Sequence, residues 1–465
     1  MNGLVSALNT ASSALNVFSQ ALGVDETNIA NSSTPGYAAQ RATISPIDPN
    51  GAAGAGTAVD TVIVTSSGNV FTDALVQAAS SQAAASQTRV SQLTPINQLF
   101  DITGSTGILA AFQQFSQAFA SLAVTPNDPT AGASALTAAG SIAAAFRSVA
   151  QSFDTQSRQL SQSAQNVTGQ INTLAQSIAQ LNARIKSSGG EDPAADASLR
   201  NDLDQLSSLV DISVTTDSSG TVAVLAGGQL PLVLGDQAYT LTTNLAGAPG
   251  SQVTSSGGGN SPASFSGQLG AVLDTQNNTI DALIGGGGQT GSLNTLAAGF
   301  ANLVNNAFSN GTTAAGQPGQ NIFTWDQSDP TDAARTLTLV PGLTPADLAT
   351  ASATQSNGVA NYLAALASST APGDQIGGFP AEGLFSSIAA SVGQQLSDAT
   401  AASTADQSAL TAAQTNRQQQ SGVSLDQEAT NVTAFERSYQ ANAQVVSILD
   451  QLTQDIINLI PTTAG

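Results

Sequence analysis

Apolar side chains recur at alternating steps of four and three residues along the first thirty positions of the chain, with only Asp25 bringing a charge into the series. A seven-residue repeat of this kind predicts a helix whose apolar seam packs against another helix. At 1.5 Å per residue, a helix of this length is ~45 Å long. The members of this seam are Leu4, Leu8, Ala11, Leu15, Phe18, Leu22, Asp25 and Ile29.

The last forty residues carry a second seven-residue pattern with a wider apolar face. A face this broad predicts neighbours on more than one side of the helix, which Pro461 should end. One series of positions holds Leu425, Val432, Tyr439, Val446, Thr453 and Ile460. The complementary series holds Phe435, Asn442, Leu449 and Ile456, and the flank holds Val445, Ile448, Leu452 and Leu459.

The segment NSSTPGYAAQR, residues 31–41, predicts a helix stop followed by a turn. Pro35 fixes its own φ and disfavours helical geometry at Thr34. The Pro-Gly pair favours a type II turn in which Gly36 takes a positive φ. Tyr37 follows directly, in a chain with only 4% aromatic residues. We expect Tyr37 to anchor the turn against neighbouring helices.

Between the two ends the periodicity changes twice. Residues 71–210 have helical spacing, of which INTLAQSIAQLNARI (171–185) is the best example. From residue 211 apolar and polar residues alternate between glycines, which predicts hairpins. Helical spacing returns at 262–310 and 384–420, with short strands and turns predicted at 321–345.

These patterns predict a mainly α protein with a central β portion, in the α+β class, built as an elongated multi-domain rod. Paired terminal coiled-coil helices should form one end, followed by a helical-bundle domain and a small β-rich outer domain. The expected divisions are 1–34 with 424–465 for the coiled coil, 35–210 with 262–310 and 384–423 for the bundle, and 211–261 with 311–383 for the β-rich or irregular outer portion.

Composition excludes several classes of function. The chain of 465 residues has no Cys and no His, which removes thiol nucleophiles, disulfides, Cys/His zinc sites and Ser-His-Asp triads. Ten basic against 31 acidic residues give a net charge of −21, which argues against nucleic acid and anionic membranes as partners. We therefore expect a protein that is not an enzyme, with no catalytic, cofactor-binding or metal site.

Four features could carry chemistry, and each has a simpler structural interpretation. The stretch IGGGGQTG (284–291) lacks the Gly-Lys-Ser/Thr ending of a phosphate loop, and DQSDPTD (326–332) lacks the spacing of an EF-hand. Asp202 and Asp204 are two residues apart on a predicted helix, so they face different ways and are expected to be solvated. Lys186 could form a Ser-Lys dyad, but a charge at a helix C-terminus explains it better.

Both ends of the chain resemble known signatures. NIANSSTPGYAAQR (28–41) resembles the N-terminal signature of bacterial flagellar axial proteins, the rod, hook and hook-associated proteins, usually seen as N-I-A-N-x-x-T-x-G-Y. Residues 421–446 are similar to the C-terminal signature of the same family. The matching C-terminal positions are Asp426, Glu428, Tyr439, Gln440, Ala441 and Asn442.

The interior is similar to one branch of this family. The stretches INTLAQSIAQLNARI, NDLDQLSSLVDISV (201–214) and GTVAVLAGGQLPLVLG (220–235) resemble the helical domain of a hook-associated protein. The resemblance implies a structural component that forms the junction layer between hook and filament and is required for filament assembly. A rod or hook subunit is the nearest alternative, since it shares both end signatures but not this interior. A secreted cell-wall hydrolase using carboxylates and a coiled-coil adhesin or export translocator are more distant alternatives.

The same resemblance implies partners and a location. We expect self-association in a ring-like helical layer, contacts with the hook protein and the adjacent hook-associated protein, and a cytoplasmic export chaperone on the C-terminal helix. Export through the flagellar type III channel would make the protein secreted, as a part of the bacterial flagellum. Residues 1–40 contain no Lys or Arg and no continuous apolar run, so a cleaved signal peptide is not expected.

The seams and the signatures together predict that both chain ends form the assembly interface. In an isolated subunit these helices would leave apolar stripes in water, so we expect them to gain order on assembly. The predicted N-terminal interface residues are Leu4, Leu8, Leu15, Phe18, Leu22, Asn28, Ile29, Asn31, Thr34, Pro35, Gly36 and Tyr37. The predicted C-terminal ones are Leu425, Val432, Phe435, Tyr439, Gln440, Asn442, Val446, Leu449, Leu452 and Ile456.

Overall fold

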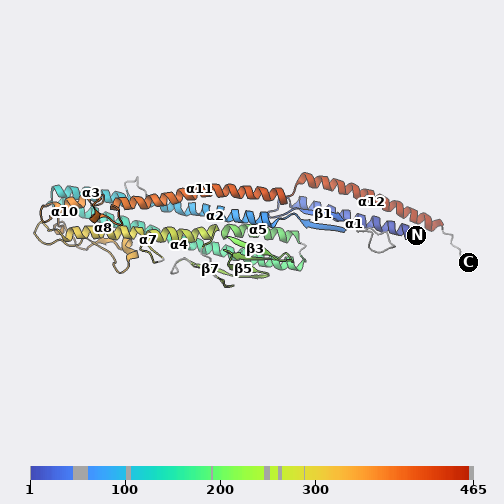
Figure 1. Cartoon of the computed structure of the whole chain (residues 1–465), viewed down its shortest axis with the longest axis horizontal. Helices are drawn as coiled ribbons and strands as arrows, with labels where there is room; N and C mark the ends of the chain where they lie inside the picture. Colours follow the sequence, from blue (N-terminus) through green and yellow to red (C-terminus); the bar gives the residue numbers. More distant parts are fainter. Residues whose placement is uncertain are drawn as a thin grey trace.

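The molecule is a long rod made of a helical body and a narrower helix pair that continues it at one end (Figure 1). The computed structural model describes residues 2–45, 61–100, 106–189, 192–245, 252–259, 264–286 and 288–459. Both termini lie toward the free end of the helix pair. The chain therefore leaves the pair, builds the body and returns, as the helical ends and the β-containing middle of the sequence predict.

The narrow end consists of α1 (Asn2–Asn31) and α12 (Leu425–Leu459), which pack against each other in antiparallel fashion. A two-stranded antiparallel hairpin of β1 (Gln40–Ser45) and β2 (Thr61–Ser66) lies against α1. This hairpin was not among the predicted elements, although VIV at 62–64 has the β-branched composition of a strand. The predicted helix end at Pro461 and the seam position Ile460 lie outside the described residues.

The body is a bundle of long helices around α4, which runs for 59 residues from an N-cap at Asp128. The Asp128 carboxylate accepts a hydrogen bond from Thr130 N, and Pro129 starts the helix where no backbone donor is needed. By length and composition, α4 is the described helix that could cross a membrane, and here it is the core helix of the bundle. The bundle helices are α2 (Val70–Gln98), α3 (Gly107–Val124), α4 (Pro129–Ser187), α5 (Pro193–Leu209), α6 (Gly267–Asp274), α7 (Asp281–Ile284), α8 (Ser292–Ser309), α10 (Gly358–Leu366) and α11 (Ala381–Ser421).

The far end of the body is held by an aromatic cluster. Phe112 contacts Phe300 with ring centroids 4.8 Å apart, and Phe115 contacts Phe119 at 4.4 Å. These rings come from α3 and α8 and are almost completely buried, so they belong to the apolar core. Further short elements are η2 (Pro330–Asp332), α9 (Ala333–Thr336), η3 (Pro345–Asp347), η4 (Pro372–Asp374) and the two-stranded sheet of β9 (Phe323–Thr324) and β10 (Thr338–Leu339), while the π-helical η1 (Thr275–Ile280) joins α6 directly to α7.

The central β portion lies against the side of α4. Its four-stranded antiparallel sheet has the order β3-β4-β5-β6, and β7 pairs with β8 in a separate hairpin. Two asparagines of α4 attach it: the Asn182 side chain bonds Val222 N and O, and the Asn172 side chain bonds Leu241 N and O. The strands are β3 (Ile212–Thr216), β4 (Val222–Ala226), β5 (Leu230–Leu234), β6 (Gln237–Ala238), β7 (Leu241–Asn244) and β8 (Gln252–Ser255).

The predicted fold class, mainly α with a central β portion in an elongated molecule, is confirmed. The hairpins predicted from residue 211 onward are present as β3 to β6. Residues 311–383, expected to be β-rich or irregular, contain short strands but also the helix α10. The exact division of the chain into three portions stays a prediction.

Candidate assembly interface

The two predicted seams meet in the α1–α12 pair. Phe18 of α1 and Phe435 of α12 contact each other with ring centroids 6.3 Å apart. The half-buried members of the predicted interface in this pair are Leu4, Leu8, Leu15, Phe18 and Leu22 on α1, and Val432, Phe435, Asn442, Val446 and Leu449 on α12. The structure thus brings together residues more than 400 positions apart in the sequence.

The most buried apolar positions of α1 hold smaller side chains than the heptad pattern predicts. Ala11, Val17 and Ala21 are buried, whereas the leucines beside them are only half-buried. Small side chains allow close approach of neighbouring backbone, and the larger leucines then flank the contact. Ile29, which the seam includes, is exposed. The predicted seam included Ala11 but not Val17 and Ala21, because it followed the largest apolar side chains.

A second apolar stripe on α12 is exposed in the single chain. It consists of Val445, Ile448, Leu452 and Ile456, spaced by three and four residues, and Ile448 is 57% exposed. Tyr439 and Leu425 are also exposed, on other parts of the helix surface, and so is Gln440. Soluble monomers rarely leave such a run of large aliphatic side chains in water. The stripe is therefore a surface suited to contact with another chain.

A buried polar cluster lies at the base of the helix pair around Asn28, which is 0% exposed. Its Nδ2 donates to Gln40 O at 2.7 Å and to Glu428 Oε2 at 3.1 Å. Its Oδ1 accepts from the Tyr37 hydroxyl at 2.9 Å and from Gln40 N at 2.8 Å. One side chain therefore joins α1, α12, the turn and the start of β1.

Two carboxyl groups adjoin this cluster. Asp25 and Glu428 are 3% and 7% exposed, on facing helices. Burial, and then the hydrogen bond and the charge of Glu428, raise the pKa of Asp25 to about 7. Burial and the nearby Glu428 charge also raise the pKa of the Tyr37 hydroxyl. Asp25, which interrupts the apolar seam, thus has a specific partner on the other helix.

The turn at residues 34–37 has the predicted geometry. Tyr37 N donates to Thr34 O at 3.1 Å, and Gly36 has a φ of 77°, as a type II turn requires. The Thr34 hydroxyl and backbone N–H also bond to Asn31, at 3.2 and 2.9 Å. A Cβ on Gly36 would lie 2.4 Å from Ala197 O in α5. Gly36 is thus required both for its φ and for the close approach of the turn to the body, while Pro35 is exposed.

Ser67 and Ser421 form hydrogen bonds with each other at the joint, where the α1–α12 pair meets the body. The Ser67 hydroxyl donates to Ser421 O at 3.1 Å, and the Ser421 hydroxyl donates to Ser67 O at 3.0 Å. Ala39 N also donates to Ser421 O at 2.9 Å, and Ser67 N donates to Ala39 O at 2.8 Å. This reciprocal contact could not be predicted from the sequence, because a single serine in a serine-rich chain does not stand out from the others.

Charged side chains lie beside the same joint. Arg417 contacts Asp204 at 2.7 Å and Asp73 at 3.6 Å, and Arg200 lies 3.5 Å from Asp73. Burial raises the pKa of Asp204 even though Arg417 acts in the opposite direction. Asp202 instead accepts a hydrogen bond from the Ser177 hydroxyl at 2.6 Å. The expectation that Asp202 and Asp204 form a solvated face was therefore wrong, because both are engaged in contacts between helices.

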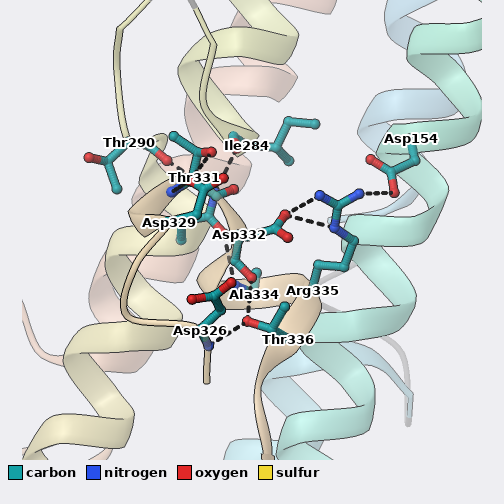
Figure 2. A network of polar contacts seen from close by, with 11 residues as sticks. Asp154, Ile284, Thr290, Asp326, Asp329, Thr331, Asp332, Ala334, Arg335 and Thr336 are labelled. Atoms are coloured by element: carbon teal, nitrogen blue, oxygen red, sulfur yellow. Dashed lines mark hydrogen bonds and ion pairs between the residues drawn. The ribbon is translucent and has the colours of Figure 1, made fainter. Parts of the chain in front are cut away.

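The DQSDPTD stretch is a set of capped turns (Figure 2). Asp326 accepts from Ser328 N and Asp329 from Thr331 N, both at 2.9 Å, while Asp332 pairs with Arg335. Each of these carboxylates thus accepts a hydrogen bond from a residue close to it in the sequence. Arg335 also forms an ion pair with Asp154 of α4 at 3.3 Å. Within the described ranges, His, Cys, Asp and Glu form no group of three that could hold a metal.

The other two candidate features, Lys186 and the glycine stretch at 284–291, are explained by their structural surroundings. Lys186 is exposed in the last turn of α4, where its charge complements the helix dipole. In the glycine stretch at 284–291, Asn294 Nδ2 donates to Ile284 O at 2.6 Å and to Thr290 O at 3.0 Å. Figure 2 shows these carbonyls beside the 326–336 segment, so Asn294 links the two loops. Residue 287 of this stretch lies outside the described residues.

Comparison with known proteins gives two family matches. Residues 93–323 match the helical domain of the flagellar hook-associated protein FlgK, and residues 414–459 match the C-terminal region of the flagellar basal body rod proteins FlgEFG. The first match runs from the last turns of α2 to the start of β9, so it includes α3 to α8 and the central β portion but not α10 or α11. The second covers the end of α11 and all of α12, including the exposed stripe.

Curated relatives and a solved structure extend the likeness. Flagellar hook-associated protein 1 of Bacillus subtilis is 24% identical, over 98% of this chain and 99% of the relative. The Escherichia coli protein of the same name is 26% identical, over 68% of this chain and 60% of the relative. The flagellar hook junction protein FlgK from Burkholderia pseudomallei has a similar fold, with a TM-score of 0.64 at 15% identity over 76% of this chain and 100% of that one.

Proposed function

The chain belongs to the family of flagellar hook-associated protein 1, and on that premise we propose that it builds the junction layer between the flagellar hook and the filament. It is a structural component of the flagellum, from a family of structural proteins rather than enzymes. In this proposal filament assembly requires the layer, because the layer lies between the hook and the filament. The protein works beside the components of the hook and of the filament.

The observation that carries the proposal is the match of residues 93–323 to a hook-associated helical domain. The C-terminal match by itself would fit a rod or hook subunit equally well, since it is to the rod proteins. Likeness to a hook-associated protein over 98% of the chain supports the same choice. The rod and hook alternative therefore ranks second.

The finer assignments are proposals that rest on the geometry of the chain ends. We propose that the terminal portion of the chain, residues 1–34 with 424–465, which contains the α1–α12 pair, forms the inner part of a ring-like layer of identical subunits. The exposed stripe at Val445, Ile448, Leu452 and Ile456 would then be buried against neighbouring subunits, the hook protein or the adjacent hook-associated protein. Before export, a cytoplasmic chaperone would cover the same apolar helix, and export would need no cleaved signal.

The test is deletion of the gene, followed by electron microscopy of the cells and an assay for flagellin in the medium. We expect hooks without filaments and flagellin shed unassembled, both restored by the wild-type gene. Complementation with Ile448→Asp should fail, because the charge enters a surface that assembly buries. It should leave the isolated chain folded, since Ile448 is mostly exposed there. Gln451→Asp, on the polar side of α12, is the matched control and should restore filaments.

Other results of the deletion and complementation experiments would contradict different parts of the proposal. Loss of hooks in the deletion strain would indicate a rod or hook subunit, and normal filaments would refute the junction role. Equal complementation by Ile448→Asp and Gln451→Asp would leave the junction role intact but refute the stripe as an assembly surface. Secretion of each variant into the medium must be measured, because a variant that is not exported cannot report on assembly.

A further inference from the structure

Two carboxyl groups are buried against each other at the base of the α1–α12 pair. Asp25 belongs to α1 and Glu428 to the first turn of α12, and both side chains are more than nine-tenths buried. They come from opposite ends of the chain. A contact between them therefore forms only when the two terminal helices pair.

The hydrogen bonds at this contact require a proton that neither carboxylate has when ionised. Asn28 Nδ2 supplies a donor to Glu428 Oε2 at 3.1 Å, but Asp25 Oδ2 is buried with no hydrogen-bond partner. Glu428 and Asn431 of α12 are the side chains that act on the Asp25 carboxyl, Glu428 by hydrogen bonding and charge and Asn431 by hydrogen bonding. Two ionised carboxylates are acceptors only, so one of them must be protonated for the pair to bond.

The elements packed around Asp25 do not neutralise it with a cation. From α12 it meets Glu428 and the neutral Asn431, and the turn before β1 contributes the neutral Tyr37 beside Glu428. Arg41 on β1 is exposed. Among the described residues, no Lys or Arg acts on Asp25, so a proton is the available source of positive charge.

We propose that Asp25 and Glu428 share one proton across the α1–α12 interface, and that this proton is a pH-sensitive latch on the pairing of the terminal helices. The latch is a property of the single chain. It does not depend on the role in the flagellum, and its test uses the isolated full-length protein. Failure of the latch and failure of the proposed function are therefore separate results.

The direction of the pH effect follows from where the proton binds. In separated helices Asp25 has its ordinary pKa near 3.8, and in the pair burial and then Glu428 raise that pKa to about 7. The paired state therefore holds the proton more tightly, and pairing is strongest below the lower pKa. As the pH rises from about 4 to about 7, the pairing constant falls by about tenfold per pH unit. Above that pH range the pairing constant no longer depends on pH.

Pairing can be measured with two fluorescent labels, because the natural chain has no cysteine. Asn9→Cys on α1 and Gln444→Cys on α12 introduce exposed attachment points. Energy transfer between the labels, followed through urea titrations at pH 5, 6, 7 and 8, reports separation of the two helices. We expect the urea midpoint to fall from pH 5 to pH 7 and then to level off.

Two substitutions test whether the pH dependence of helix pairing comes from Asp25 and Glu428. Asp25→Asn keeps a neutral, hydrogen-bonding side chain and should remove the step between pH 5 and pH 7. Glu26→Gln changes the exposed neighbouring carboxylate and should leave the step unchanged. A flat wild-type profile, or an unchanged step in Asp25→Asn, would overturn the proposal. So would restoration of pairing at pH 8 by added Ca²⁺, since that would identify a bridging cation instead of a proton.

If the terminal helices of the Asp25→Asn variant do not pair, a direct measurement on the wild-type chain still tests the proposal. Infrared difference spectra of the wild-type chain between pH 6 and pH 8 should contain the carbonyl band of a protonated carboxylic acid. Labelling with ¹³C-aspartate or ¹³C-glutamate should shift that band. If neither label shifts a band that titrates in this range, the shared proton does not exist.

Discussion

Replacing Gly36 by alanine tests whether the turn at residues 34–37 is fixed by its contact with the body. Gly36 has a φ of 77°, and a Cβ there would lie 2.4 Å from Ala197 O and 2.9 Å from Asn201 N in α5. Ordinary contact begins at about 3.4 Å, so the turn must move by 3.4 − 2.4, or about 1 Å. The helix backbone that it meets cannot move aside as a flexible side chain would.

The expected cost has two parts. A left-handed conformation costs a residue with a Cβ about 1–2 kcal/mol. A shift of about 1 Å would also lengthen the bond from Ala39 N to Ser421 O, now 2.9 Å, beyond hydrogen-bonding distance. A lost hydrogen bond adds about 1 kcal/mol. The sum of about 2–3 kcal/mol corresponds to a 30- to 150-fold increase in local opening, at 1.4 kcal/mol for each factor of ten.

Hydrogen exchange with mass spectrometry at one fixed pH measures that opening in peptides that cover residues 34–45 and 61–69. Gly228→Ala is the matched control, because Gly228 has a φ of 69° but no atom within 4 Å of its Cβ position. The control should accelerate exchange only in the β4–β5 hairpin, by the conformational cost alone. If Gly36→Ala accelerates exchange no more than the control does in its own hairpin, the contact with α5 does not fix the turn.

Three further substitutions probe other contacts. Phe435→Ala removes the ring that meets Phe18 and should lower the stability of the terminal pair by about 2 kcal/mol, read from its urea midpoint by the same energy-transfer labels. Asn182→Ala leaves buried backbone groups of β4 unpaired and should cost about 3 kcal/mol, seen as faster proteolysis within residues 211–245 while the helices stay protected. Arg417→Met leaves the partly buried Asp204 without its closest cation and should lower the thermal midpoint of the body, with partial rescue by Arg417→Lys.

The sequence could predict those parts of the fold that depend on periodicity. The seams at both ends place Phe18 and Phe435 on apolar faces, and the contact of the two rings follows once the helices pair. The turn at Gly36 was predictable because proline and glycine restrict φ in known ways. Alternation with glycines predicted the hairpins after residue 211 for the same kind of reason.

Other parts depend on distances that no local pattern records. Asp25 was visible as an interruption of a seam and Glu428 as part of a signature, but their contact depends on the register of two helices 400 residues apart. The reciprocal bonds of Ser67 and Ser421 likewise appear only when two remote segments cross. The burial of Ala21 depends on how closely its neighbours approach, and an alanine-rich chain offers many equivalent positions.

The joint at Ser421 also determines which relative motions of the two ends of the rod are possible. Two covalent connections cross it, from β2 to α2 and from α11 to α12, and a single connection would allow free swivelling. Two connections restrict that freedom to hinge bending about the line between them, and the turn at Gly36 adds a packing contact with α5 beside them. Together these connections and the packing contact oppose rotation of the body about the α1–α12 pair, so a torque on one is passed to the other. That is the mechanical property a coupling needs when one side of it is turned.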